Sequence, residues 1–173
     1  AWLYTGDDRY ARQFAALLDD WIARVPLTEE SAPNTWRSLE TGLRCENWLR
    51  AAALLAGSGV LTDERRARMD ASLTRHGEHL VRSYDTFHKL SNWGILQDNG
   101  LYLLGLYLGR QDWCALAARR MDENLHRSVF ADGSQWEQSP LYHCEVLHCA
   151  LNTLHYAQAA GQTLPHRMVE NIR

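Results

Sequence analysis

Two short segments concentrate amide, acid, phenol and imidazole side chains within a sequence that otherwise has the pattern of apolar helices. The first reads SNWGILQDNG (91–100), and the second reads DGSQWEQSPLYH (132–143). In the first, Gln97 and Asp98 lie among Leu and Tyr residues, where polar groups are costly unless they meet partners or water. In the second, the rings of Trp136 and Tyr142 could pack on the C–H faces of sugars. Both segments therefore indicate candidate binding or catalytic sites.

Each segment also has a purely structural explanation. Asn92 lies at a predicted helix N-cap, a position that Asn often occupies. Tyr142 could simply pack against the start of the helix that follows. From the residues alone, both explanations stay open.

The cysteines and histidines offer a metal site as a further alternative. Cys144 and His148 are four residues apart, and His155 follows two turns later, which is an acceptable ligand spacing on one helix face. Cys45 could add a fourth ligand. Only two of these ligands have firm spacing, so an inward-facing stripe of small and aromatic residues is favoured. The four cysteines form no CxxC pair and decide neither zinc nor disulfide.

The elements that must position these residues are helices. Apolar residues recur with helical rather than alternating spacing, and no segment reads convincingly as a strand. We expect helices over about 7–23, 36–56, 63–84, 93–108, 111–125 and 140–160. Helices of this length joined by short loops stack as a bundle, a solenoid or a closed α/α toroid, and periodicity alone does not choose among them.

The composition limits the partners. The net charge of −3 gives no global sign of binding to nucleic acid or to an anionic membrane. No window approaches the roughly 18 unbroken apolar residues of a membrane span. An anionic substrate would have to meet local positive charge in a cleft. The 173 residues suffice for one domain with a core.

The two segments and the upstream string TGLRCENW (41–48) resemble, in order and separation, the signature segments of heparinase II/III-type polysaccharide lyases and the related alginate lyases. The resemblance covers essentially the whole chain. It implies an all-α fold of antiparallel helical hairpins that form part of an incomplete (α/α) toroid. It also implies that residues 1–173 are a single helical domain, a fragment of a longer protein whose C-terminal β-sandwich is missing here.

The activity that the resemblance implies is β-elimination on a uronic-acid polysaccharide. A base removes the C5 proton, and an acid protonates the departing glycosidic oxygen. Asn92 matches the family's carboxylate-binding Asn, and Tyr142 matches its catalytic Tyr, the candidate acid and sometimes also base. A free Tyr has a pKa near 10, so a base role needs a nearby cation, for which Arg44 and His143 are the predicted sources. We expect Glu137 to orient Arg44 or Tyr142.

The predicted substrate-binding residues, besides those just named, share amide or aromatic side chains and are Trp93, Gln97 and Trp136. Many relatives have His directly after the signature Asn, where this chain has Trp93. Either another His serves, or Tyr142 performs both proton transfers, and Trp93 could stack on a sugar ring.

The resemblance also sets expectations for partners and compartment. We expect an acidic polysaccharide substrate, no nucleic acid or membrane partner, and no organic cofactor. A metal, if present, would be structural and bound in the missing part. A truncated toroid would expose apolar helix faces that invite self-association. The bacterial periplasm or secretion is favoured, and the cytoplasm stays open.

Two other functions remain open at this point. One is a non-catalytic carbohydrate-binding helical domain. The other is a glycoside hydrolase on an α/α toroid, which needs two carboxylates across a cleft, and Asp98 and Glu137 are the candidates. The ultraviolet absorbance of the product distinguishes elimination from hydrolysis. We also expect the isolated 173-residue chain to be inactive, or nearly so.

Overall fold

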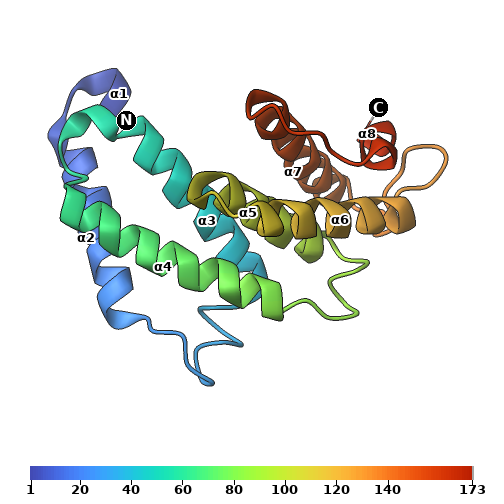
Figure 1. The fold of residues 1–173 in the computed structure, drawn as a ribbon, viewed down its shortest axis with the longest axis horizontal. Coiled ribbons are helices and arrows are strands. Elements are labelled where there is room, and N and C mark those ends of the chain that lie inside the picture. Colours follow the sequence, from blue (N-terminus) through green and yellow to red (C-terminus); the bar gives the residue numbers. More distant parts are fainter. Residues whose placement is uncertain (173) are drawn as a thin grey trace.

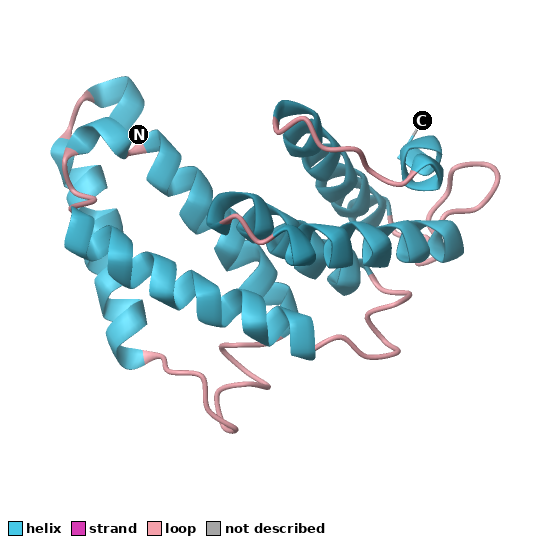
Figure 2. Ribbon diagram, viewed as in Figure 1, coloured by secondary structure: helices cyan, strands magenta, loops and turns pink. Residues whose placement is uncertain are grey.

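The computed structural model describes residues 1–172, whose regular structure is helical throughout (Figure 1, Figure 2). The helices are α1 (Trp2–Thr5), α2 (Asp8–Arg24), α3 (Ser38–Leu54), the 3-10 turn η1 (Ala56–Ser58), α4 (Asp63–Arg82), α5 (Asn92–Leu108), α6 (Gln111–Ser128), α7 (Pro140–Ala159) and α8 (His166–Ile172). Within the described residues no strand forms, and one isolated bridge pairs Val129 with Gln135. All six predicted helices are confirmed, with no end shifted by more than three residues.

Local capping chemistry explains why several helices begin where they do. The side chain of Asp7 accepts a hydrogen bond from the backbone N–H of Arg9 at 2.9 Å, as the sequence predicts. Thr62 does the same for Arg65 at 3.2 Å at the start of α4. These bonds satisfy backbone donors that have no acceptor within the helix.

The prediction that Asn92 caps α5 is wrong. Ser91 is the N-cap residue, and Asn92 is the first residue of the helix. The side chain of Asn92 is therefore free to bond elsewhere.

Three helices, α3, α5 and α7, form one layer and run in the same direction. Gly42 near the start of α3 lies against Gln97 of α5, and Glu46, one turn later, bonds to Asn99. Asn99 also accepts a hydrogen bond from Asn152 in the second half of α7. Residues further along one helix therefore contact residues further along the next, as in parallel helices.

The helices α4 and α6 form a second layer and run the opposite way. Tyr107, at the end of α5, bonds to Asp70 near the start of α4, whereas Gln97 near the start of α5 bonds to Leu80 near the end of α4. Asn124, near the end of α6, bonds to the segment that precedes α5. The parallel helices α3 and α5, each followed by an antiparallel helix in the other layer, make this fold part of an incomplete (α/α) toroid (Figure 1).

The α5 helix is the centre of the core. Most of its residues are buried, and it packs against α3, α4, α6 and α7. Gly42 and Gly100 allow the backbones of α3 and α5 to touch, since a Cβ on Gly100 would lie 2.5 Å from the Gly42 carbonyl oxygen. No residue with a side chain fits there without displacing a backbone.

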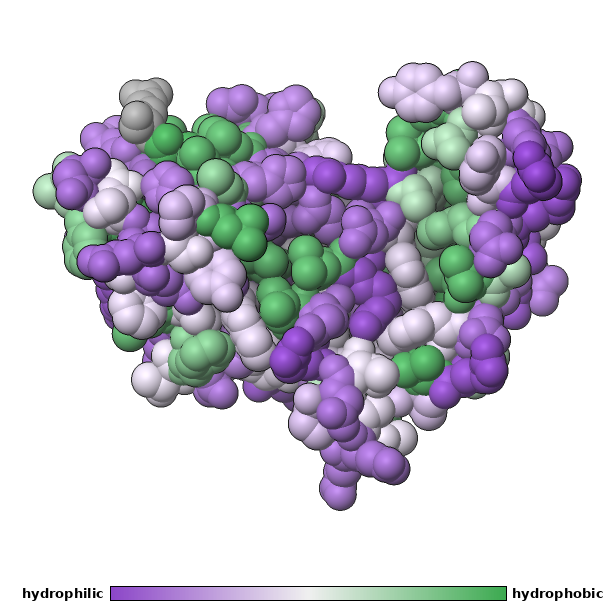
Figure 3. Space-filling model, turned by 180° about the vertical axis from the view of Figure 1, so that it is seen from behind, coloured by the Kyte–Doolittle hydropathy of each residue, from purple (hydrophilic) through white to green (hydrophobic). Residues whose placement is uncertain are grey.

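Polar side chains join α3 to α7 across α5. The Glu46 carboxylate, only 5% exposed, accepts from Asn99 Nδ2 at 2.7 Å and pairs with Arg50 at 2.8 Å. Arg50 donates to Asn152 Oδ1 of α7 at 3.1 Å. One carboxylate thus joins α3 to α5, and Arg50 extends the network to α7. Figure 3, the view from behind, shows apolar patches between polar side chains on that face and a notch in the upper outline.

Candidate functional site

The N-terminal ends of α3, α5 and α7 lie at the same end of their layer, because the three helices are parallel. Their first residues are Ser38, Asn92 and Pro140. The first backbone N–H groups of a helix lack intrahelical acceptors and carry partial positive charge. This end of the layer therefore presents three helix termini suited to negatively charged groups.

Asn92 is fixed by a carboxylate that lies 45 residues away in the chain. Glu137 accepts hydrogen bonds from Asn92 Nδ2 at 3.0 Å and 3.1 Å, and from the Asn92 backbone N–H at 3.1 Å. Asn92 is only 7% exposed. Bonds to a charged acceptor are stronger than neutral ones, so Glu137 sets the orientation of the Asn92 amide. Among the described residues, the Glu137 carboxylate bonds to Asn92 and Gln135, and no hydrogen bond or ion pair joins it to Arg44 or Tyr142.

Gln135 in turn holds Glu137. Its Nε2 donates to the Glu137 carboxylate at 2.9 Å, and its Oε1 accepts from the Glu137 backbone N–H at 2.9 Å. Gln135 is buried, and Gln138 completes the turn with a φ of 50°. The loop 129–139 is thus a built structure that presents Glu137 to Asn92. Gln135 lies in a segment that the sequence singles out, but it was missed because nothing in the sequence distinguishes it from the neighbouring Gln138.

A second buried amide holds the segment that precedes α5. Asn124 Nδ2 donates to the carbonyl oxygens of His88 at 2.9 Å and Ser91 at 3.1 Å. Gly94 lets this segment approach α5, since a Cβ there would lie 2.0 Å from the His88 carbonyl oxygen. Asn124 and Gly94 therefore fix where Asn92 enters the helix.

Tyr142 and Trp136 present accessible rings near the same loop. Tyr142 is 44% exposed in the first turn of α7, which follows the loop directly, and its backbone N–H bonds to Ser139. Trp136 is also 44% exposed and donates from Nε1 to the Leu90 carbonyl oxygen. His143 is half-buried and lines an open hollow of about 580 Å³ between the loop and the start of α7. Tyr142, Trp136 and His143 thus flank the loop that holds Asn92.

Trp93 lies on the other side of Asn92, towards α3. Its ring packs edge-on against Phe87 with centroids 5.3 Å apart, and the Arg37 guanidinium lies 4.6 Å from its centroid. Trp93 and Arg37 line a cavity of about 410 Å³. The indole itself is half-buried.

Arg44 lies elsewhere, in an aromatic cage between α2, α3 and α4. Its guanidinium lies 4.2 Å from the centroid of Trp21 and donates to the Thr35 carbonyl oxygen at 2.6 Å and to His76 Nε2 at 3.2 Å. Burial lowers the pKa of this guanidinium. The structure does not bring Arg44 together with Asn92, Glu137 and Tyr142, and its contacts indicate a role in packing.

The two buried polar residues of α5 do not face a ligand. Gln97, predicted to bind substrate, is 0% exposed and donates from Nε2 to the Leu80 carbonyl oxygen at 2.7 Å. That prediction is corrected, because a side chain without exposed surface cannot touch a polymer. Asp98 is also 0% exposed and pairs with Arg120 at 3.4 Å. Its burial raises the carboxyl pKa well above the usual value. The carboxylate pair that a hydrolase would need is therefore not formed by Asp98 and Glu137.

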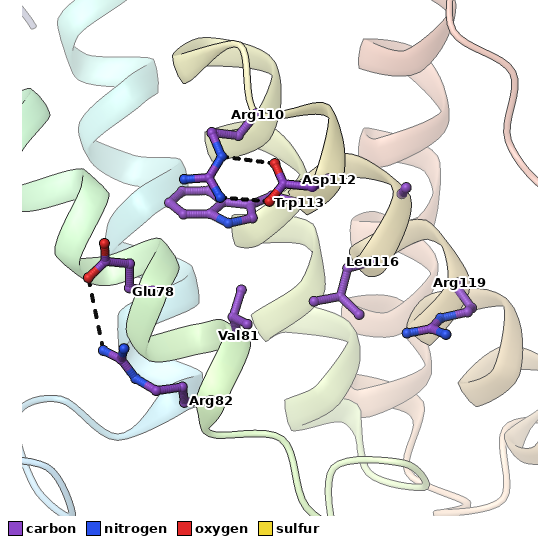
Figure 4. A pocket seen from close by; sticks show the side chains of 9 residues that line it. Glu78, Val81, Arg82, Arg110, Asp112, Trp113, Leu116 and Arg119 are labelled. Carbon is purple, nitrogen blue, oxygen red and sulfur yellow. Dashed lines mark hydrogen bonds and ion pairs between the residues drawn. The ribbon is translucent and has the colours of Figure 1, made fainter.

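Another hollow lies on the outer layer between α4 and α6. It has a volume of about 660 Å³ and is open to solvent. Its charges are mostly paired, as Figure 4 shows for Arg110 with Asp112 and for Arg82 with Glu78. None of the predicted site residues lines it, so it does not extend the candidate site.

The described part of the chain contains no group of three or more His, Cys, Asp or Glu side chains placed to hold a metal ion. All four cysteines are free, and Cys45 and Cys149 are buried. Among residues 1–172, no helix is long and apolar enough to cross a bilayer.

A family model described as the heparinase II/III N-terminus matches residues 1–173. The chain belongs to this family. It is 23% identical over 149 residues to a heparin-sulfate lyase of Pedobacter heparinus, which covers 83% of this chain. It is 21% identical over 183 residues to a heparin-sulfate lyase of Bacteroides stercoris, which covers 93%.

Solved structures show the same fold. The crystal structure of heparinase III matches 99% of this chain with a TM-score of 0.86 at 20% identity. A heparan sulfate lyase HepC mutant from Pedobacter heparinus matches with a TM-score of 0.81 at 21% identity, again over 99%. The chain spans 22% and 27% of the two curated relatives, and 27% and 28% of the two solved chains. The similarity therefore covers about a quarter of each relative.

Proposed function

We propose that this heparinase II/III N-terminal domain is the helical part of a polysaccharide lyase that cleaves a uronic-acid-containing polymer by β-elimination. The observation that carries the proposal is the position of Asn92 and Tyr142. They lie at the N-terminal ends of adjacent parallel helices, on either side of one loop. The activity belongs to the complete protein, in which we expect a further β-sandwich domain to complete the cleft.

Asn92 serves in this proposal as the group that neutralises the sugar carboxylate. Removal of the C5 proton builds negative charge on that carboxylate, and donors placed there in advance lower the barrier. The Asn92 amide has two N–H bonds, and Glu137 fixes its orientation through at least one of them. We propose that the amide hydrogen that Glu137 does not need faces the substrate, supported by the positive end of α5.

Tyr142 serves as the proton-transfer group. Its exposed phenol lies on the first turn of α7, where a polymer can reach it without displacing buried side chains. Trp136 bonds to the Leu90 carbonyl oxygen in the segment before Asn92, and Trp93 directly follows Asn92 in α5. We propose that they support sugar rings on the two sides of the cleaved bond, and that His143 contacts the sugar beside Tyr142.

The names of the relatives favour a sulfated glycosaminoglycan as the polymer. The two curated relatives are both heparin-sulfate lyases. With 21–23% identity over about a quarter of their length, these relatives make heparan sulfate the first polymer to test.

The test is an activity assay of the complete protein on a panel of uronic-acid polymers. Product formation is followed by near-ultraviolet absorbance, which reports the conjugated double bond that elimination creates, and in parallel by new reducing ends. We expect both signals to rise together on one or more polymers. New reducing ends without absorbance would mean hydrolysis and would refute the proposal. Polymer binding without either signal would favour the non-catalytic carbohydrate-binding alternative.

A further inference from the structure

A serine, a histidine and an aspartate form a hydrogen-bonded line beside the lyase candidate residues. Ser38 Oγ lies 2.7 Å from His88 Nε2, and His88 Nδ1 lies 2.7 Å from Asp85 Oδ1. Ser38 is the first residue of α3, whereas Asp85 and His88 belong to the segment between α4 and α5. None of the three is needed for the elimination proposed above.

The bond to the carboxylate determines which imidazole nitrogen carries the proton. Asp85 places a carboxylate oxygen at 2.7 Å and its backbone N–H at 3.2 Å from His88 Nδ1. The carboxylate contact is the shorter one, and an ionised carboxylate only accepts hydrogen bonds, so this contact assigns the proton to Nδ1, which donates to Asp85. Nε2 is then an acceptor, and Ser38 donates its hydroxyl proton to it. A serine is activated for attack when its hydroxyl donates to a base that a carboxylate holds in place. Ser38, His88 and Asp85 have this arrangement.

Neighbouring groups hold the hydrogen-bonded residues Ser38, His88 and Asp85 in place. Asp85 Oδ1 accepts the backbone N–H of Phe87 at 2.9 Å, which fixes the carboxylate. The His88 ring stacks on Tyr84 with centroids 5.9 Å apart and an interplanar angle of 29°. The hydrogen bond from His88 lowers the pKa of the Asp85 carboxyl, so this group is ionised at neutral pH. The exposed position of Asp85 weakens its effect compared with a buried carboxylate.

The surroundings of Ser38 supply space and donors. All three residues line the cavity of about 410 Å³ that also contains Trp93 and Arg37. The N-cap residue of α3, Arg37, makes no side-chain capping bond, so first-turn backbone N–H groups beside Ser38 can donate to a negatively charged oxygen. Ser38 is only 4% exposed, so a reagent must be small enough to enter the cavity.

We propose that Ser38, His88 and Asp85 form a second site, at which Ser38 is the nucleophile for esters of small acyl groups. Ser38 Oγ bonds to the ester carbonyl carbon, its proton passes to His88 Nε2, and the carbonyl π electrons move onto oxygen. The intermediate collapses as the C–O bond to the alcohol breaks, and Nε2–H protonates the leaving oxygen. Water then attacks the acyl-serine while Nε2 takes its proton, which returns to Ser38 Oγ as the acid leaves.

The experiment uses a fluorophosphonate probe, whose phosphorus forms a bond to an activated serine oxygen as fluoride leaves, together with hydrolysis of p-nitrophenyl acetate. We expect a probe adduct on the peptide that contains Ser38, located by mass spectrometry of the folded chain. Ser38→Ala and His88→Gln remove the adduct and the hydrolysis. Asp85→Asn slows both by roughly 10-fold or more, below the ~10⁴-fold effect at a buried triad carboxylate. Lyase activity does not enter this readout.

The matched control is Ser91→Ala. Ser91 is equally buried at 2% exposure, and its Oγ has no hydrogen-bond partner, so its loss leaves labelling unchanged. Circular dichroism verifies that each variant folds. If Ser38→Ala does not fold, the labelling of Asp85→Asn tests the proposal instead, because Asp85 is exposed and its substitution leaves the core intact. The proposal would be overturned by a folded wild-type chain that forms no adduct, or by unchanged labelling in Ser38→Ala or Asp85→Asn. The three hydrogen-bonded residues would then have a structural role only.

Discussion

Acidification destabilises this fold through His76, whose ring is buried among tryptophans and cannot take up a proton without loss of packing and hydrogen bonds. His76 is 0% exposed, and its ring centroid lies 4.4 Å from that of Trp36. Nδ1 donates to the Ser72 carbonyl oxygen at 2.7 Å, and Nε2 accepts from Arg44 at 3.2 Å. Burial lowers the pKa of His76 to about 3, and the charge of Arg44 acts in the same direction.

The size of the effect follows from proton linkage. In the unfolded chain His76 has a pKa of about 6.5, so below that pH the unfolded state binds a proton that the folded state does not. Its contribution is fully present above pH 6.5 and is lost as pH falls towards 3, at about 1.4 kcal/mol per pH unit. Between pH 8 and pH 5 the free energy of unfolding falls by about 2 kcal/mol on account of His76 alone.

Other groups titrate over the same range, so a single pH profile does not isolate His76. Burial lowers the pKa of His79 as well, which adds to the loss at low pH. Burial raises the pKa of Asp98, which acts in the opposite direction. The His76→Gln variant keeps both groups, so the difference between the wild type and this variant cancels their contributions.

The assay is urea unfolding of wild type, His76→Gln and the control His126→Gln, which removes an exposed histidine, at pH 8.0, 6.5 and 5.0. We expect the stability gap between wild type and His76→Gln to shrink by about 2 kcal/mol from pH 8.0 to pH 5.0. The stability gap between wild type and His126→Gln is expected to stay constant over the same pH values. A gap that stays constant across this range would refute the inference that His76 is neutral and buried.

Three further predictions concern packing and the site. Gly100→Ala places a Cβ 2.5 Å from a backbone oxygen of α3. Urea unfolding is expected to show a free energy of unfolding lowered by about 1–3 kcal/mol. The control Gly57→Ala is nearly neutral, because its Cβ meets only a side-chain atom at 3.6 Å. Glu137→Gln removes the charged acceptor of Asn92 and lowers the free energy of unfolding by about 1 kcal/mol. In the complete protein this variant reduces kcat more than it raises KM. Unchanged stability and unchanged kinetics relative to the wild type would contradict the inference that Glu137 orients Asn92. The isolated chain associates with increasing concentration in sedimentation experiments, through apolar side chains such as Leu151 on α7, which is 46% exposed; a monomer at all concentrations would contradict this.

The helices could be predicted from the sequence because their signals are local. Apolar spacing, the Asp7 and Thr62 caps and the Pro at the start of α7 act over a few residues, and the structure confirms them. The direction and layering of the helices could not be read from periodicity. They depend on backbone contacts such as Gly42 against Gly100, which join residues 58 positions apart in the chain.

The candidate site was predictable in its residue types but not in its contacts. The resemblance pointed to Asn92 and Tyr142, and both lie at the same end of the inner layer. The burial and contacts of Arg44 and Gln97 could not be predicted, because burial is decided by how helices pack, and a polar residue inside an apolar helix can serve either the core or a site. The bond of Glu137 to Asn92 depends on how the loop 129–139 folds, for which the sequence carries no local signal.

The most direct measurement of the central claim is the elimination rate of Tyr142→Phe in the complete protein, read by near-ultraviolet absorbance on the polymer that the wild type cleaves best. The ring of Tyr142 is 44% exposed and its hydroxyl makes no hydrogen bond within the described residues, so the variant keeps its fold. The account predicts that kcat falls by about 10²-fold or more, whereas Tyr156→Phe on the same helix keeps normal turnover. Near-normal turnover of Tyr142→Phe would contradict the account.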